Sequence, residues 1–208
     1  PNYNYNSCSR VDSPEDVKRL IAEFQTLEGT NYTHGQIVDM GRTNHVLHGK
    51  WLLDISPDKV EGDWPLIRNA CLQGKLASTA KISDTPGGGF YKVCVYTPNF
   101  DDKAEVLRVR QAILNDVQIS TDSILRYKLD AFTYCGVYSA TGSKIRTTTY
   151  DCGGLNDLQC TTLITAHETC TKTGVSCPRC YPSCLPESTA TKKTKSTTTI
   201  NDDQSICT

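Results

Sequence analysis

The sequence lacks several features that would each decide a class of function. No apolar run approaches the roughly 18 residues that a membrane-spanning helix needs. The formal net charge is only -1, so the chain lacks the basic excess with which many proteins neutralise nucleic-acid phosphates. No catalytic signature surrounds any cysteine, and the run Gly87-Gly88-Gly89 lacks the helix and the Lys-Ser/Thr pair of a phosphate-binding loop. We therefore expect a protein that is not an enzyme, with no cofactor, no nucleic-acid partner and no membrane span.

Cysteine, by contrast, is abundant. All eleven cysteines are candidates for disulfide bonds: Cys8, Cys71, Cys94, Cys135, Cys152, Cys160, Cys170, Cys177, Cys180, Cys184 and Cys207. Cytosolic proteins rarely tolerate so many thiols, whereas an oxidising compartment converts them into cross-links. Because the number is odd, one thiol stays free or pairs with another chain.

The Cys177-x-x-Cys180 motif lies near two further cysteines and His167, a set that could also hold zinc. Zinc knuckles usually pair two such motifs, and only one is present. Disulfides are therefore the favoured interpretation, and we expect no metal.

Two further observations bear on the compartment. Asn31-Tyr32-Thr33 is a sequon, which makes Asn31 a candidate for N-glycosylation. The chain begins at Pro1 rather than at methionine, which a removed signal peptide or simple trimming would both explain. With the cysteines, these features predict a secreted, extracellular protein.

Composition and periodicity divide the chain into four parts. These are an N-terminal arm (1–12), an α+β globular domain (13–150), a cysteine-rich module (151–185) and a Ser/Thr-rich extended tail (186–208). Within the domain, the expected helices cover about residues 13–28, 63–73 and 101–114, and the expected strands cover residues 45–55, 76–83, 90–97, 124–129, 131–138 and 144–150. Residues 30–43 are interpreted as an irregular connection. The pattern predicts a mainly antiparallel sheet with about three helices on one face, followed by a disulfide-rich irregular tail.

Several short motifs within the domain carry a family resemblance. They are Gly49-Lys50-Trp51-Leu52-Leu53, Gly74-Lys75-Leu76, Ala80-Lys81-Ile82-Ser83, Val93-Cys94-Val95-Tyr96-Thr97-Pro98, Val106-Leu107-Arg108-Val109-Arg110, Tyr127-Lys128-Leu129-Asp130 and Tyr134-Cys135-Gly136-Val137-Tyr138. Over roughly residues 45–150 the chain resembles the basophilic-leukaemia-expressed protein family. That resemblance implies the fold of translation initiation factor 4E, a curved antiparallel sheet with helices on its convex side. The family has no settled activity, so the resemblance implies a fold and no mechanism.

The fold implied by the resemblance raises the question of cap binding, which needs two aromatic planes around a methylated base. Only Trp51 and Trp64 are tryptophans, and both lie among apolar residues, so we interpret them as core residues. His45 and His48 are interpreted as surface or edge residues. A possible anionic-ligand face is formed by basic residues on strands: Arg126, Lys128, Lys144 and Arg146.

The terminal segments suggest a function in assembly. Cysteines lie near both ends, and residues 197–200 favour an extended backbone that could add a strand to a neighbouring sheet. O-linked sugars could occupy Ser188, Thr189, Thr191, Thr194, Ser196, Thr197, Thr198 and Thr199. We therefore expect an extracellular structural glycoprotein that forms a homo-oligomer or filament through its ends. Two alternatives stay open: an extracellular module that binds glycans or small ligands, and an intracellular nucleotide- or RNA-binding protein of cap-binding-like fold.

Overall fold

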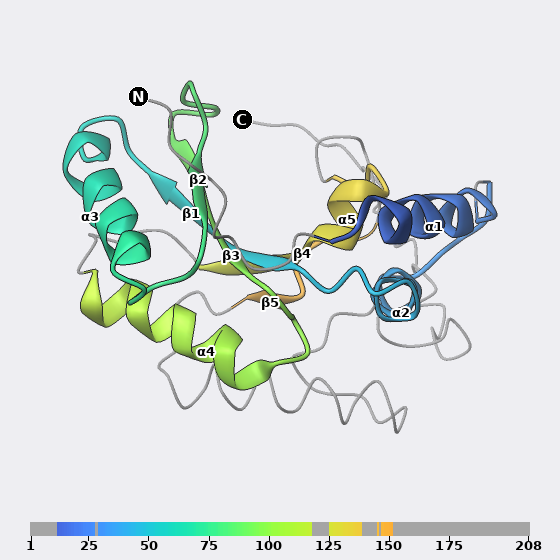
Figure 1. The fold of residues 1–208 in the computed structure, drawn as a ribbon. Helices are drawn as coiled ribbons and strands as arrows, with labels where there is room; N and C mark the ends of the chain where they lie inside the picture. The colour runs from blue at the N-terminus through green and yellow to red at the C-terminus, as the bar shows by residue number, and fades with distance from the viewer. Residues whose placement is uncertain (1–11, 28, 118–124, 139–144, 146, 152–208) are drawn as a thin grey trace, which may run out of the picture.

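A computed structural model describes residues 12–27, 29–117, 125–138, 145 and 147–151 as an α+β domain (Figure 1). Its strands are β1 (Gly49–Ile55), β2 (Ala80–Ile82), β3 (Tyr91–Thr97), β4 (Arg126–Leu129) and β5 (Tyr150–Asp151). They form one sheet in the order β2-β3-β1-β4-β5, and every neighbouring pair is antiparallel. The helices are α1 (Pro14–Gln25), α2 (His34–Thr43), α3 (Val60–Leu72), α4 (Lys103–Gln111) with a π-helical turn η1 (Ala112–Asp116), and α5 (Asp130–Tyr134).

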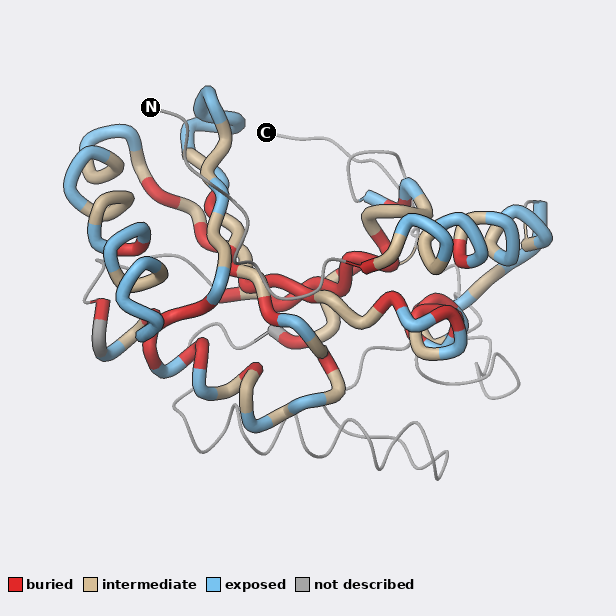
Figure 2. Tube along the Cα trace, in the orientation of Figure 1, coloured by how far each residue is buried: buried red, intermediate tan, exposed pale blue. Residues whose placement is uncertain are grey.

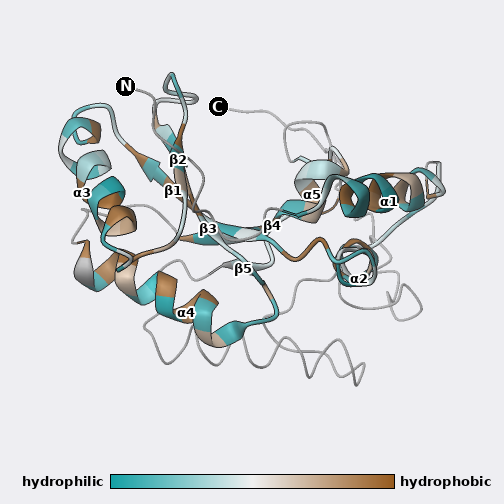
Figure 3. Cartoon of the chain, viewed as in Figure 1, coloured by the Kyte–Doolittle hydropathy of each residue, from teal (hydrophilic) through white to brown (hydrophobic). Residues whose placement is uncertain are grey.

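One face of the sheet forms the hydrophobic core. Because side chains alternate along a strand, Trp51 of β1 shares this face with Val95 of β3 and Tyr127 of β4. All three are fully buried. Helices α3 and α4 lie against this side, and Figure 2 shows buried residues running through the central strands and at intervals along α4, whereas in α3 only Ile67 is buried. In Figure 3, α4 carries hydrophobic and hydrophilic residues in alternating stripes, as expected of a helix with one face on the core.

The other three helices form a separate group at the end of the sheet where β1 begins (Figure 1). Helices α1, α2 and α5 contact one another pairwise. Leu20 of α1, Ile37 of α2 and Phe132 of α5 are fully buried. The backbone N–H of Asp130 donates to the carbonyl of His48 at 2.9 Å, which ties this group to the start of β1.

Local sequence signals explain how α1 and α2 begin. The Ser13 hydroxyl caps α1 by accepting from the N–H of Asp16 at 3.1 Å, as the Ser-Pro-x-Asp pattern predicts. The prediction of an irregular connection over residues 30–43 is wrong, because α2 occupies most of it. Thr33 and Gln36 form a reciprocal capping box there, a signal that the sequence contains and that the abundance of polar residues obscured.

Two other elements differ from their predictions. A strand was expected over residues 131–138, but α5 covers the first part of that range, and Gly136, two residues beyond its end, adopts a positive φ of 68°. Its β-prone residues form a helical turn because Ala131 and Phe132 are buried in the three-helix group. Helix α3 begins at Val60 rather than near Asp63, so Pro65 lies within the helix, where it removes one hydrogen bond near the exposed N-terminal end.

The remaining predictions are met in part or lie elsewhere. The strands expected at 45–55, 90–97 and 124–129 correspond to β1, β3 and β4. The strand expected at 76–83 is the shorter β2, and among the described residues of the expected strand 144–150 only Tyr150 belongs to a strand. The predicted cysteine-rich module (151–185) lies outside the described residues except for Asp151, which belongs to β5, and the Ser/Thr-rich tail lies wholly outside them. Among the helices of the described part, none is long and apolar enough to cross a membrane.

Candidate functional site

The second face of the sheet is polar. We call it the polar face, and its side chains come from β1, β2, β3 and β4: Lys50, Leu52, Asp54, Lys81, Lys92, Cys94, Tyr96, Arg126 and Lys128. Five of these side chains are cationic and one is anionic. The alternation that buries Trp51 on one side therefore gathers positive charge on the other.

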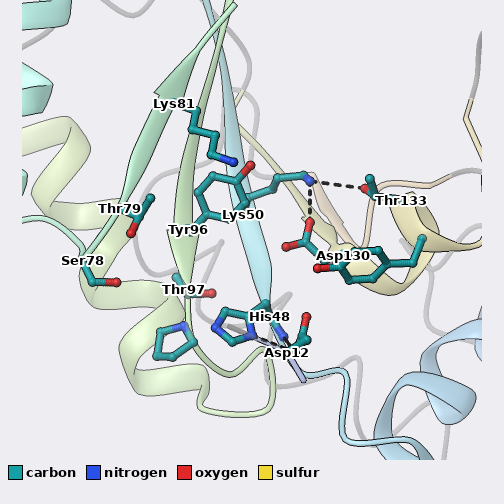
Figure 4. Close-up of a pocket in the computed structure, with 12 residues that line it drawn as sticks. Asp12, His48, Lys50, Ser78, Thr79, Lys81, Tyr96, Thr97, Asp130 and Thr133 are labelled. Atoms are coloured by element: carbon teal, nitrogen blue, oxygen red, sulfur yellow. Dashed lines mark hydrogen bonds and ion pairs between the residues drawn. The ribbon is translucent and has the colours of Figure 1, made fainter. Parts of the chain in front are cut away.

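A pocket of about 280 Å³ opens at the end of the polar face where β1 begins (Figure 4). Strand β1 and the residue before it contribute Lys50 and His48, and β3 contributes Tyr96. The segment leading into β2 supplies Ser78 and Thr79. The rest of the lining comes from Asp12 before α1, Lys81, Thr97, Pro98, Asp130, Thr133 and Tyr134. The volume is close to the lower limit of typical small-molecule sites, which suits a ligand of about one ring.

A buried ion pair forms one wall of the pocket. The ammonium of Lys50 binds the carboxylate of Asp130 and donates to the Thr133 hydroxyl at 3.3 Å. Both charged side chains are about nine-tenths buried, at 10% and 9% exposure. Burial raises the pKa of the Asp130 carboxyl, and the neighbouring Lys50 opposes that shift. The pair fixes the position of a cation in the wall of the pocket.

Two ammonium groups converge on Tyr96. The Nζ atoms of Lys50 and Lys81 lie 5.4 Å and 5.7 Å from the centroid of its ring. Burial raises the pKa of the Tyr96 phenol, and it raises the pKa of Tyr134 to about 12. Both phenols are therefore neutral hydrogen-bond donors at physiological pH.

At the opposite end of the pocket, Asp12 holds His48. Oδ1 of Asp12 lies 2.7 Å from Nδ1 of the imidazole, and it also accepts from the backbone N–H groups of Leu47 at 3.0 Å and His48 at 3.4 Å. The carboxylate is almost fully buried, with 2% of the side chain exposed, and the imidazole is 14% exposed. An imidazole oriented in this way can exchange a hydrogen bond or a proton with a ligand.

The predicted anionic-ligand residues lie near this pocket but do not line it. Arg126 donates to Asp54 at 3.2 Å. Lys128 is buried, donates to the carbonyl of Val137 at 3.3 Å and lies 4.4 Å from the centroid of the Tyr138 ring. Burial, reinforced by Lys50, lowers the pKa of Lys128 to about 8. Lys144 and Arg146 lie outside the described residues.

The positions of the two tryptophans decide whether they could bind a cap-like base. Trp51 is fully buried beneath the sheet, and its indole N–H donates to the carbonyl of Val106 at 2.9 Å. Trp64 is partly buried and packs against the core. The interpretation of both as core residues is confirmed, so this pair cannot enclose a methylated base.

Four of the residues predicted to form disulfides or to carry glycans lie in the described part of the chain. Cys71, Cys94 and Cys135 are half-buried free thiols, and burial raises the pKa of each, that of Cys135 to about 11. Asn31 is exposed in the connection before α2. The other eight disulfide candidates and all the O-glycosylation candidates lie outside the described residues. Within the described residues, no group of three or more His, Cys, Asp or Glu side chains could hold a metal ion.

A family model describes the same part of the chain that builds the pocket. The model for basophilic leukemia-expressed protein Bles03 matches residues 10–136. The chain belongs to the Bles03 family. This confirms the resemblance, although the match begins before residue 45 and ends before residue 150. The Bles03 region contains the whole lining of the pocket, from Asp12 to Tyr134.

Most residues that line the pocket of this Bles03 protein were not predicted from the sequence as parts of a site. Lys50 and Tyr96 lie in motifs that were recognised, but alternation alone does not tell which face of a strand carries a ligand site. His48 was expected at the surface or an edge, and it is half-buried in the pocket wall. Asp12 was assigned to a polar arm. Its contact with His48 spans 36 positions, and no local pattern predicts a contact over that distance.

Proposed function

We propose that the protein binds a small anionic ligand of about one ring in the pocket at the end of the polar face, without catalysing its conversion. One observation carries the proposal: the ammonium groups of Lys50 and Lys81 flank the same Tyr96 ring within a pocket of about 280 Å³. Two cations held close together around a neutral donor favour an anion.

The charges in the pocket support an anion over a cation. Oδ1 of Asp12 already accepts three hydrogen bonds, and the carboxylate of Asp130 binds Lys50. Lys81 is exposed and makes no ion pair with a described residue. The ligand's negative charge therefore has a cation available at the mouth of the pocket, and Lys50 behind it.

Calorimetric titration of the full chain with small anions, from inorganic phosphate to D-glucuronate, tests this proposal. Replacing Lys81 with alanine should weaken binding by about tenfold, because a charge-assisted hydrogen bond contributes about 1.5 kcal/mol or more. Lys92→Ala is the matched control. Lys92 lies on the same face, but it is paired with Asp54 and lies outside the pocket lining. Equal binding by the wild type and Lys81→Ala would contradict the proposal.

Nucleotide or RNA binding is the weaker alternative. It would need a stacking platform, and the two tryptophans belong to the core. A nucleoside monophosphate in the same titration provides the comparison. Affinity that depends on the base rather than on the phosphate would favour the alternative.

The assembly function predicted from the terminal segments also stays a proposal. We propose a secreted protein whose tail is cross-linked by disulfides and whose ends mediate self-association. The support is the cysteine count and the composition of residues 151–208. Non-reducing electrophoresis, negative-stain imaging and thiol titration of unreduced protein test it. A monomer with close to eleven free thiols would contradict it.

The finer description of the fold is likewise a proposal. We propose that the sheet is curved as in translation initiation factor 4E, with the cysteine-rich module as a separate irregular unit. The family resemblance and the positions of α3 and α4 on one face support this. An experimental structure of the full chain would test both points.

A further inference from the structure

We propose that the ligand of this pocket carries a hydroxyl group in addition to its anionic group, so that its chemical class is a hydroxylated ring acid such as a uronic acid. This inference rests on the proposed function and adds the second recognition element. The structural basis is the pair formed by Asp12 and His48 at the far end of the pocket (Figure 4).

The surroundings of Asp12 fix the tautomer of His48. Oδ1 of Asp12 accepts from two backbone N–H groups, those of Leu47 and His48, so this oxygen acts as an acceptor. Nδ1 of His48 lies 2.7 Å from the same oxygen and must therefore donate to it. In the neutral imidazole the remaining nitrogen, Nε2, is then a hydrogen-bond acceptor.

This acceptor is directed at the pocket. His48 belongs to the lining, and Figure 4 shows its second ring nitrogen pointing away from Asp12. Among the described residues, none donates a hydrogen bond to Nε2. A fully deprotonated anion cannot donate to it, whereas a hydroxyl group can.

A second observation concerns the carboxylate itself. Oδ2 of Asp12 is buried and has no hydrogen-bond partner among the described residues. Leaving a carboxylate oxygen in this state is costly. A neutral residue before α1 would avoid that cost. The carboxylate orients the imidazole toward the ligand, and this role would explain its presence despite that cost. We therefore assign Asp12 as a positioning residue.

The two recognition elements lie at different ends of the pocket. In Figure 4, Lys81 and the phenol of Tyr96 are at one end, and His48 with Asp12 is at the other. A ligand that satisfies both ends must carry its charge and its hydroxyl on opposite sides of a small body. A six-membered ring with a carboxylate and several hydroxyls has this shape, and the pocket of about 280 Å³ accommodates a single ring of this kind.

Three probes separate the two elements in calorimetric titrations of the full chain. D-glucuronate carries both the carboxylate and the hydroxyls, cyclohexanecarboxylate carries only the charge, and methyl glucoside carries only the hydroxyls. We expect glucuronate to bind about tenfold more tightly than cyclohexanecarboxylate, and methyl glucoside to bind more weakly than either acid. The first ratio reports the hydroxyl contact, because both acids carry one carboxylate on a six-membered ring.

Two replacements of His48 assign that ratio to Nε2. His48→Phe keeps an aromatic side chain and removes both nitrogens, so glucuronate should lose its advantage over cyclohexanecarboxylate. His48→Gln places an amide near the position of Nε2 and should restore part of the preference. Thermal melts of both variants establish that the domain is folded, and retained binding of cyclohexanecarboxylate shows that the Lys81 end still binds an anion.

The outcomes distinguish this inference from the proposed function. Equal binding of the two acids by the wild type, or a preference for glucuronate that survives His48→Phe, would overturn the hydroxyl contact and leave anion binding standing. If neither acid binds while methyl glucoside does, anion binding itself fails, and the present inference fails with it.

Discussion

The two faces of the sheet differ in packing and in charge. Trp51 and Leu52 are neighbours on β1, yet Trp51 is fully buried beneath α3 and α4, whereas Leu52 is half-buried on the polar face, opposite Arg126. On the core face even a glycine is constrained, since a Cβ on Gly49 would lie 2.2 Å from the hydroxyl of Tyr127. On the polar face, Lys50 and Lys128 are directly opposite each other on neighbouring strands. Placing like charges opposite each other costs stability, so the polar face is not built for stability alone.

The strongest test of this comparison replaces the two neighbours on β1. Trp51→Ala should reduce the free energy of unfolding by about 3–5 kcal/mol, because it leaves a large cavity and the carbonyl of Val106 without its donor. Leu52→Ala should cost only about 1 kcal/mol, since the side chain is half-buried. Urea denaturation measures both. Similar losses would show that the faces do not differ in packing.

The second test removes the buried cation of the polar face. Lys50→Met should destabilise the protein by about 3 kcal/mol, because it leaves the Asp130 carboxylate buried without its partner. Adding Asp130→Asn in the same chain should recover most of that loss. If the double variant is no more stable than Lys50→Met, the cost comes from lost packing rather than from the isolated charge.

The third test concerns the second lysine of the facing pair. Lys128→Met should stabilise the protein by about 1 kcal/mol at pH 7, since it removes a buried charge at the expense of one hydrogen bond. In the folded wild type the pKa of Lys128 is about 8, below its ordinary value of 10.5, so between these pH values the unfolded chain binds more protons.

This difference in proton binding fixes the direction of the pH dependence. The stability of the wild type relative to Lys128→Met should rise as the pH increases from about 8 to 10.5, because the cost of the buried charge disappears there. Comparing the two proteins cancels the other groups that titrate in this range. A constant difference in the free energy of unfolding across the range would contradict the assignment.

The smallest effect is expected from the exposed ion pair of the same face. Lys92 is 52% exposed and pairs with Asp54. Lys92→Ala should therefore change the free energy of unfolding by no more than about 0.5 kcal/mol, as is usual for surface pairs. Chemical denaturation in low and high salt checks this, and a loss comparable to that of Lys50→Met would erase the distinction between buried and exposed cations.

The sequence predicted the elements whose signals are local. The Ser13 cap identified α1, and alternation identified β1 and β3 and placed Arg126 and Lys128 on one face of β4. It failed where tertiary packing decides between helix and strand, as in α5. The pocket could not be predicted from the sequence. Its lining residues Asp12, His48, Lys50 and Asp130 come together only when the three-helix group packs against the end of the sheet.

The contact of Asp12 with the backbone N–H groups of Leu47 and His48 has a practical consequence for anyone who shortens or tags this protein. The residue lies immediately before the Ser13 cap, where a truncation designed around the first helix would naturally cut. Such a truncation would retain every helix and strand of the described part and would pass the usual checks of folding. It would nevertheless release the imidazole that Asp12 holds, so expression variants of this domain should begin upstream of Asp12.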